Sequence, residues 1–152
     1  MINGKRILAL IPARGGSKGI KNKNIIDLCG KPLISYTIAA AKESRYIDSV
    51  IVSTDSEKIA EVAVSCGASV PFLRPIALAL DTSTTVEAVC HTIRTLAECG
   101  DRYDVLVLLQ PTSPLRTLED IDGALEKFER EGLPIASVSK AKDSAILLRN
   151  LK

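Results

Sequence analysis

Short unbroken apolar runs alternate with helix-like segments along this chain, and this order constrains the fold most. Residues 7–11 read ILALI, residues 49–53 read SVIVS and residues 104–109 read DVLVLL. Such runs are typical of strands that are buried on both faces of a parallel sheet. The chain is therefore predicted to have an α/β, Rossmann-like fold, with a mostly parallel sheet and helices on both of its faces.

Four helices and two shorter strands complete the predicted order. The helices are expected to begin at Pro32, at Asp55 or Ser56, at Thr84 and at Thr117, and the short strands to cover residues 70–73 and 134–138. Thr84 with Glu87, and Thr117 with Asp120, have the spacing of a capping box at a helix start. Ligands of such sheets bind beyond the carboxyl ends of the strands, so the loops that follow the strands are the expected sites.

Length and composition limit the classes of function. The chain has 152 residues, of which 46% are hydrophobic, so residues 1–152 are expected to form a single domain. Aromatic residues make up 3%, too few for nucleic-acid stacking, and the net charge of +2 means that anions must bind at local clusters of cations. No apolar run approaches the roughly 18 residues that span a membrane. The cysteines form no C-x-x-C pair, and a cytoplasmic protein is expected.

The loop after the first strand predicts a phosphate site. Residues 12–24 read PARGGSKGIKNKN, with three glycines and four cations. Glycines let backbone N–H groups approach phosphate oxygens, while Arg and Lys neutralise their charge. The spacing G-G-x-x-G differs from the G-x-G-x-x-G of a dinucleotide site, and no G-K-[ST] of a P-loop is present. A solvated turn that binds nothing is the alternative.

A second loop, residues 110–116, reads QPTSPLR and follows another predicted strand. Two prolines stiffen a run of hydrogen-bonding side chains, which suits recognition of a polyhydroxylated substrate. As the alternative, Pro111 and Pro114 shape a turn and the hydroxyl groups cap backbone atoms.

Four segments together resemble the acylneuraminate cytidylyltransferases, also called CMP-sialic acid synthetases. They are residues 8–24, 52–55, 73–81 and 109–116, and the resemblance runs in order from about residue 6 to about residue 140. It implies a fold of the nucleotide-diphospho-sugar transferase type. It also implies transfer of CMP from CTP to a nine-carbon sugar acid, such as N-acetylneuraminate, legionaminate or pseudaminate, with release of pyrophosphate.

The resemblance also implies roles for individual residues. The triphosphate and its chemistry would fall to Arg14 and Lys18, and the backbone around them to Ala13, Gly15, Gly16 and Ser17. Further nucleotide contacts would come from Asn24, Arg74 and Thr85, and sugar contacts from Gln110, Thr112, Ser113 and Arg116. Catalysis in such a site is mainly alignment and electrostatics.

The chain departs from the family pattern in two places. Ala77 stands where the family often has an acidic residue. The family usually continues further, with an arm that pairs two subunits and an Asp-x-Asp that holds Mg²⁺, and residues 139–152 offer Asp143 alone. Asp55 is expected to cap a helix, so no metal ligand is assigned. A truncated nucleotide-binding module without catalysis and a nucleotidyltransferase for another sugar acid are the alternatives.

Overall fold

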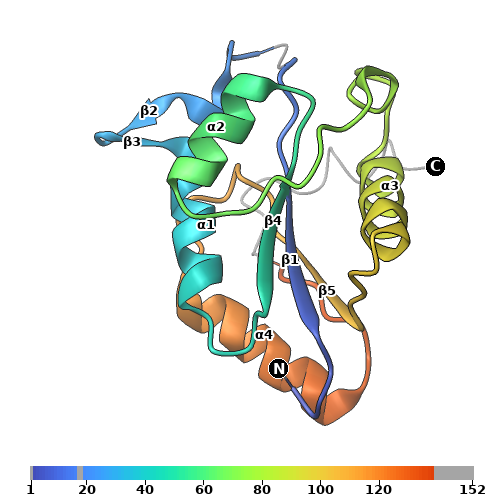
Figure 1. Cartoon of the computed structure of the whole chain (residues 1–152). Helices are drawn as coiled ribbons and strands as arrows, with labels where there is room; N and C mark the ends of the chain where they lie inside the picture. The colour runs from blue at the N-terminus through green and yellow to red at the C-terminus, as the bar shows by residue number, and fades with distance from the viewer. Residues whose placement is uncertain (1, 17–18, 139–152) are drawn as a thin grey trace, which may run out of the picture.

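The computed structural model describes residues 2–16 and 19–138, and its main feature is a parallel sheet (Figure 1). The strands of this sheet are β1 (Ile7–Pro12), β4 (Ser49–Ser53) and β5 (Val105–Leu108), in the order β4-β1-β5. In the central strand β1, Leu8 is level with Ser49 of β4 and Leu106 of β5. The three continuous apolar runs are thus confirmed as parallel strands. Burial on both faces is wrong for β5, because its Leu106 and Leu108 are 36% and 41% exposed.

One face of the sheet is covered by α1 (Leu33–Glu43), α2 (Glu57–Ser65) and α4 (Leu118–Glu131) (Figure 1). Alternate residues of β1 point to this face, because successive side chains of a strand lie on opposite sides. Ile7, Ala9 and Ile11 are 0% exposed. Their neighbours in the core include Ile34, Ile38, Ile59, Ala63, Ile121 and Leu125.

The opposite face is covered by α3 (Thr85–Glu98), which stands alone on its side of the sheet in Figure 1. Leu8 and Leu10 of β1 point to this face and form a second core cluster with Ile51 and Leu96. Helices therefore lie on both faces of the sheet, as the alternating sequence pattern predicts.

Both predicted capping boxes are present. At the start of α3, the backbone N–H of Glu87 donates to the Thr84 hydroxyl at 3.2 Å, and the Thr84 N–H donates to the Glu87 carboxylate at 2.7 Å. Thr117 and Asp120 bond in the same reciprocal way at the start of α4. Each pair satisfies backbone donors that the first turn of a helix leaves open.

The other two helix starts refine the prediction. Pro32 is the cap residue directly before α1 and not its first helical residue. Ser56 caps α2, since its hydroxyl accepts from the N–H of Ile59 at 3.4 Å. Asp55, the alternative cap, has a different partner that belongs to the candidate site.

Neither of the two predicted short strands forms. Residues 70–73 lie outside any strand, and the pairing at this edge is a single parallel bridge between Ser69 and Ile51. Pro71 has no N–H to donate, so a ladder cannot continue through it. Residues 134–138 also lie outside any strand, and Val138 is 93% exposed, because nothing in the described chain pairs with this segment.

The predicted loop before α1 contains local structure instead. It holds a 3-10 turn, η1 (Lys23–Ile25), and a hairpin of β2 (Asp27–Leu28) and β3 (Lys31–Pro32). The two turn residues of the hairpin, Cys29 and Gly30, have φ angles of 54° and 84°. Positive φ at both central positions is typical of the turns that favour two-residue hairpins. Two-residue strands are too short to show an alternating pattern in sequence.

Candidate functional site

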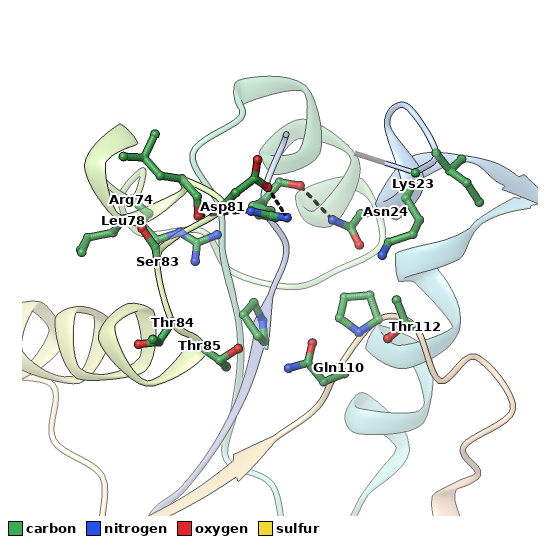
Figure 2. Close-up of a pocket in the computed structure, with 16 residues that line it drawn as sticks. Lys23, Asn24, Arg74, Leu78, Asp81, Ser83, Thr84, Thr85, Gln110 and Thr112 are labelled. Carbon is green, nitrogen blue, oxygen red and sulfur yellow. Dashed lines mark hydrogen bonds and ion pairs between the residues drawn. The ribbon is translucent and has the colours of Figure 1, made fainter. Parts of the chain in front are cut away.

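A cavity of about 620 Å³ lies where the carboxyl ends of β1, β4 and β5 meet one edge of the sheet (Figure 2). Its lining includes six residues of the predicted site: Arg14, Asn24, Arg74, Thr85, Gln110 and Thr112. The two loops singled out in the sequence therefore come together with the segment before α3, residues 74–84. This arrangement agrees with the general position of ligands in open parallel sheets.

Five other predicted residues, all within the described part of the chain, do not line this cavity. Ala13, Gly15, Gly16, Ser113 and Arg116 lie outside its lining. Ser17 and Lys18 fall outside the described residues, so their roles stay predictions.

The start of the loop after β1 is fixed by hydrogen bonds to the end of β4 and to the residues that follow it. Ala13 is 1% exposed, and its N–H donates to the carbonyl of Ser53 at 2.9 Å. Further along the loop, the N–H of Gly15 donates to Oδ1 of Asp55 at 2.9 Å. A Cβ on Gly15 would lie 3.1 Å from the Cβ of Ser56, which explains why a residue without a side chain fits there.

The contact between Gly15 and Asp55 corrects the sequence prediction. Asp55 does not cap α2, because Ser56 does. Its carboxylate instead holds the loop that follows β1. The two strand ends are neighbours only in the folded sheet, so helix-capping preferences along the chain could not indicate this contact.

Asn24 holds the far end of the same loop. Its side chain is on the 3-10 turn η1, is 5% exposed, and donates from Nδ2 to the backbone carbonyl of Arg14 at 3.0 Å. The dashed line at Asn24 in Figure 2 marks this bond. Asn24 therefore shapes the loop around Arg14, besides lining the cavity.

The side chain of Arg14 has two partners from one segment. Its Nη2 lies 2.9 Å from Oδ1 of Asp81, and its Nη1 donates to the carbonyl of Leu80 at 3.2 Å. The side chains of Arg14 and Asp81 are 36% and 40% exposed. The guanidinium is thus oriented while it stays accessible to a ligand.

Arg74 is the most unusual group of the site. It is 6% exposed, and within the described chain no partner bonds its Nε and Nη2 atoms, although both are buried. Burial lowers the pKa of its guanidinium, Asp55 opposes this shift and the positive charge of Arg14 adds to it. Buried cationic donors without partners are costly, so an anion in the cavity would relieve both the missing bonds and the repulsion.

The second predicted loop contributes the third side of the cavity. Pro111 is among the fully buried side chains, while Gln110 and Thr112 beside it line the cavity. Arg116 folds back on the loop, with its Nη1 3.5 Å from the Gln110 carbonyl. Burial lowers the pKa of Arg116, and Asp120 opposes the shift. Arg116 thus supports the turn and leaves the cavity wall to its neighbours.

Several cavity residues carry no role in the sequence prediction. Polar members of this group are Lys23, Asp81, Ser83 and Thr84. Lys23 belongs to the predicted cluster of cations, which is a signal that could have included it. Thr84 is predicted only as a helix cap, and it also lines the cavity. In Figure 2, Lys23 and Asn24 face Arg74, Ser83 and Asp81 from the opposite side of the cavity.

Mg²⁺, which the family resemblance implies, has no cluster of ligand side chains in the described part of the chain. Within residues 2–16 and 19–138, no group of three or more His, Cys, Asp or Glu side chains could hold a metal ion. Asp55 and Asp81 are each engaged with protein groups. Among the described helices, none is long and apolar enough to cross a membrane.

Comparison with known proteins finds relatives of this chain. A family model described as "Cytidylyltransferase" matches residues 8–146. A relative in Legionella pneumophila, named CMP-N,N'-diacetyllegionaminic acid synthase, is 48% identical over 88% of this chain and 58% of its own length. A Campylobacter jejuni relative, named pseudaminic acid cytidylyltransferase, is 45% identical over 80% of this chain and 52% of its own length. The chain thus spans a little over half the length of these relatives.

The fold is also that of a solved nucleotidyltransferase. A structure titled as CMP:2-keto-3-deoxy-manno-octonic acid synthetase complexed with CTP superimposes with a TM-score of 0.70 and 20% identity. The superposition covers 84% of this chain and 48% of the solved chain. The expected nucleotide-diphospho-sugar transferase type of fold is confirmed by this likeness.

Proposed function

Because the chain belongs to the cytidylyltransferase family, we propose that its cavity binds CTP for transfer of CMP to a nine-carbon sugar acid. The names of the Legionella and Campylobacter relatives support sugars of the legionaminate and pseudaminate type. N-acetylneuraminate is the third candidate, on the family resemblance. Pyrophosphate is the second product.

The single observation that carries this proposal is the buried guanidinium of Arg74. Its Nε and Nη2 are buried without a partner in the described chain, and the residue lines a cavity that Arg14 also lines. Arg14 is a second cation, and its charge disfavours the protonated state of Arg74. A protein gains nothing in stability from such a pair of like charges. A polyanion such as the triphosphate of CTP satisfies both groups at once.

The proposed reaction is an in-line displacement at phosphorus. The anomeric hydroxyl oxygen of the sugar forms a bond to the α-phosphorus, the bond from this phosphorus to the bridging oxygen of pyrophosphate breaks, and the hydroxyl proton passes to solvent. Arg14, Arg74 and Lys23 stabilise the charge that grows on the leaving oxygens. Gln110 and Thr112 line the same cavity and would bond sugar hydroxyls.

The other assignments of the sequence stay proposals. Ala13, Gly15 and Gly16 would support the loop from behind the cavity, and Ser17 and Lys18 would complete it beside the phosphates. Ser113 and Arg116 would act on the sugar through the shape of their turn. We also propose that residues 1–152 form a single domain, that the location is cytoplasmic, that two subunits pair and that Mg²⁺ has a role. Nucleic-acid and membrane partners are not expected.

Calorimetric titration of the chain with CTP, ATP, GTP and NAD⁺ tests the proposal. CTP is expected to bind more tightly than the other three. Equal or tighter binding of NAD⁺ contradicts a cytidylyltransferase site. A pyrophosphate-release assay with CTP, Mg²⁺ and each sugar acid then separates an enzyme from a nucleotide-binding module, because a module binds CTP without turnover.

A further inference from the structure

The orientation of Arg14 is set by one short piece of chain that is distant in sequence. Oδ1 of Asp81 lies 2.9 Å from its Nη2, and the carbonyl of Leu80 accepts from its Nη1 at 3.2 Å. Both partners are consecutive residues of the segment before α3. These two contacts therefore join the loop after β1 to the segment before α3.

The segment that presents Asp81 is itself held by internal hydrogen bonds. It contains the 3-10 turn η2 (Ile76–Leu78), and the N–H of Ser83 donates to the carbonyl of Leu80 at 3.0 Å. The Ser83 hydroxyl donates to the carbonyl of Ala77 at 2.9 Å. Directly after it, α3 begins with its capping box. Asp81 therefore lies in a turn that is held together by hydrogen bonds.

We propose that Asp81 is a positioning residue that orients the guanidinium of Arg14 before nucleotide binds. This inference rests on the proposed function, in which Arg14 contacts the triphosphate. An arginine side chain has many rotamers, and fixing one of them before binding removes part of the entropic cost of forming the complex. Asp81 would have this effect without touching the nucleotide itself.

A carboxylate at an anion site also has an opposing effect, since its charge repels the triphosphate. Replacement of Asp81 by Ala removes both the repulsion and the positioning bond, so this variant alone cannot separate them. Asp81→Asn removes the charge equally but keeps an oxygen that accepts from Arg14. The contrast between the Asn and Ala variants therefore isolates the positioning effect.

The test is CTP binding by the Asn and Ala variants of Asp81, with Arg14 present and with Arg14→Ala. We expect Asp81→Asn to bind CTP about three- to ten-fold more tightly than Asp81→Ala, the range for one hydrogen bond. Without Arg14 the two variants should bind alike. Glu129→Gln and Glu129→Ala, at an exposed position of α4, form the matched control pair and should not differ.

Equal CTP affinities of the Asp81 variants in the presence of Arg14 would overturn the inference, as would a difference that persists without Arg14. Inorganic tripolyphosphate serves as a second probe, because it needs the cations but no cytosine pocket. If it shows the Asn–Ala contrast while CTP binds no better than GTP, the positioning role stands and the proposed function fails. If CTP is preferred and the contrast is absent with both probes, the proposed function stands and the positioning role of Asp81 fails. Binding of neither probe overturns both.

Discussion

The carboxylate of Asp55, just beyond the end of β4, accepts a hydrogen bond from the backbone N–H of Gly15, just beyond the end of β1, at 2.9 Å. The same carboxylate favours the charged state of Arg74. One side chain thus holds the loop after β1 and partly balances the charge of the buried Arg74.

Replacement of Asp55 by Ala should lower the free energy of unfolding by about 1 kcal/mol, because the Gly15 N–H loses its partner. Asp55→Asn keeps an acceptor oxygen and should lose less than half of this amount. Urea denaturation of the two variants measures the difference. Equal losses would show that the charge of Asp55, and not its bond to Gly15, stabilises the fold.

Replacement of Arg74 by Met should separate binding from stability. The variant is expected to unfold at a urea concentration equal to or higher than that of the parent, because it removes buried donors without partners. CTP binding should weaken by about 1.5–3 kcal/mol, the range for hydrogen bonds to charged groups. Calorimetry measures the second effect. A large loss of stability with unchanged CTP affinity would assign Arg74 a purely structural role.

Arg14→Ala should weaken CTP binding by about 1.5–3 kcal/mol with little effect on stability, because its ion pair with Asp81 is partly exposed. Lys18→Ala is expected to behave in the same way on the family resemblance. Arg94→Ala, at an exposed position of α3, is the matched control and should bind CTP like the parent. Retained affinity in both loop variants would make the loop a solvated turn.

The capping box of α3 should make stability depend on acid pH. Hydrogen bonds from the backbone and side chain of Thr84 lower the pKa of Glu87 below its ordinary value of 4.5. Because the folded-state pKa is depressed, the stabilisation is present above that value and is lost as the pH falls through the folded pKa. Glu87→Gln keeps the acceptor but does not titrate.

Thermal unfolding of the parent and Glu87→Gln across this pH range measures the effect. The stability advantage of the parent should be constant near neutral pH and shrink below about pH 4.5. An advantage that is independent of pH would show that Glu87 does not change its protonation state with folding.

Local sequence patterns were sufficient to predict the elements that depend on neighbours along the chain. The strands predicted from the apolar runs of β1, β4 and β5 are confirmed, as are the capping boxes at Thr84 and Thr117. Both patterns can be recognised because they consist of residues a few positions apart in the sequence. The strand predicted at residues 70–73 is wrong, since Pro71 interrupts the ladder. The β2–β3 hairpin, with its left-handed turn, was not visible in any periodic pattern.

The same division holds for the site. The sequence by itself determined that cations and glycines follow β1, that a stiff polar loop follows β5, and that Arg74 lies in a polar connection. Only the tertiary structure decided that Asp55 binds Gly15, that Asp81 orients Arg14, and that Arg74 is buried without partners in the described chain. Parallel strands bring their carboxyl ends together from distant positions. Contacts between side chains at those ends therefore depend on sheet order and register, which no short segment of sequence encodes.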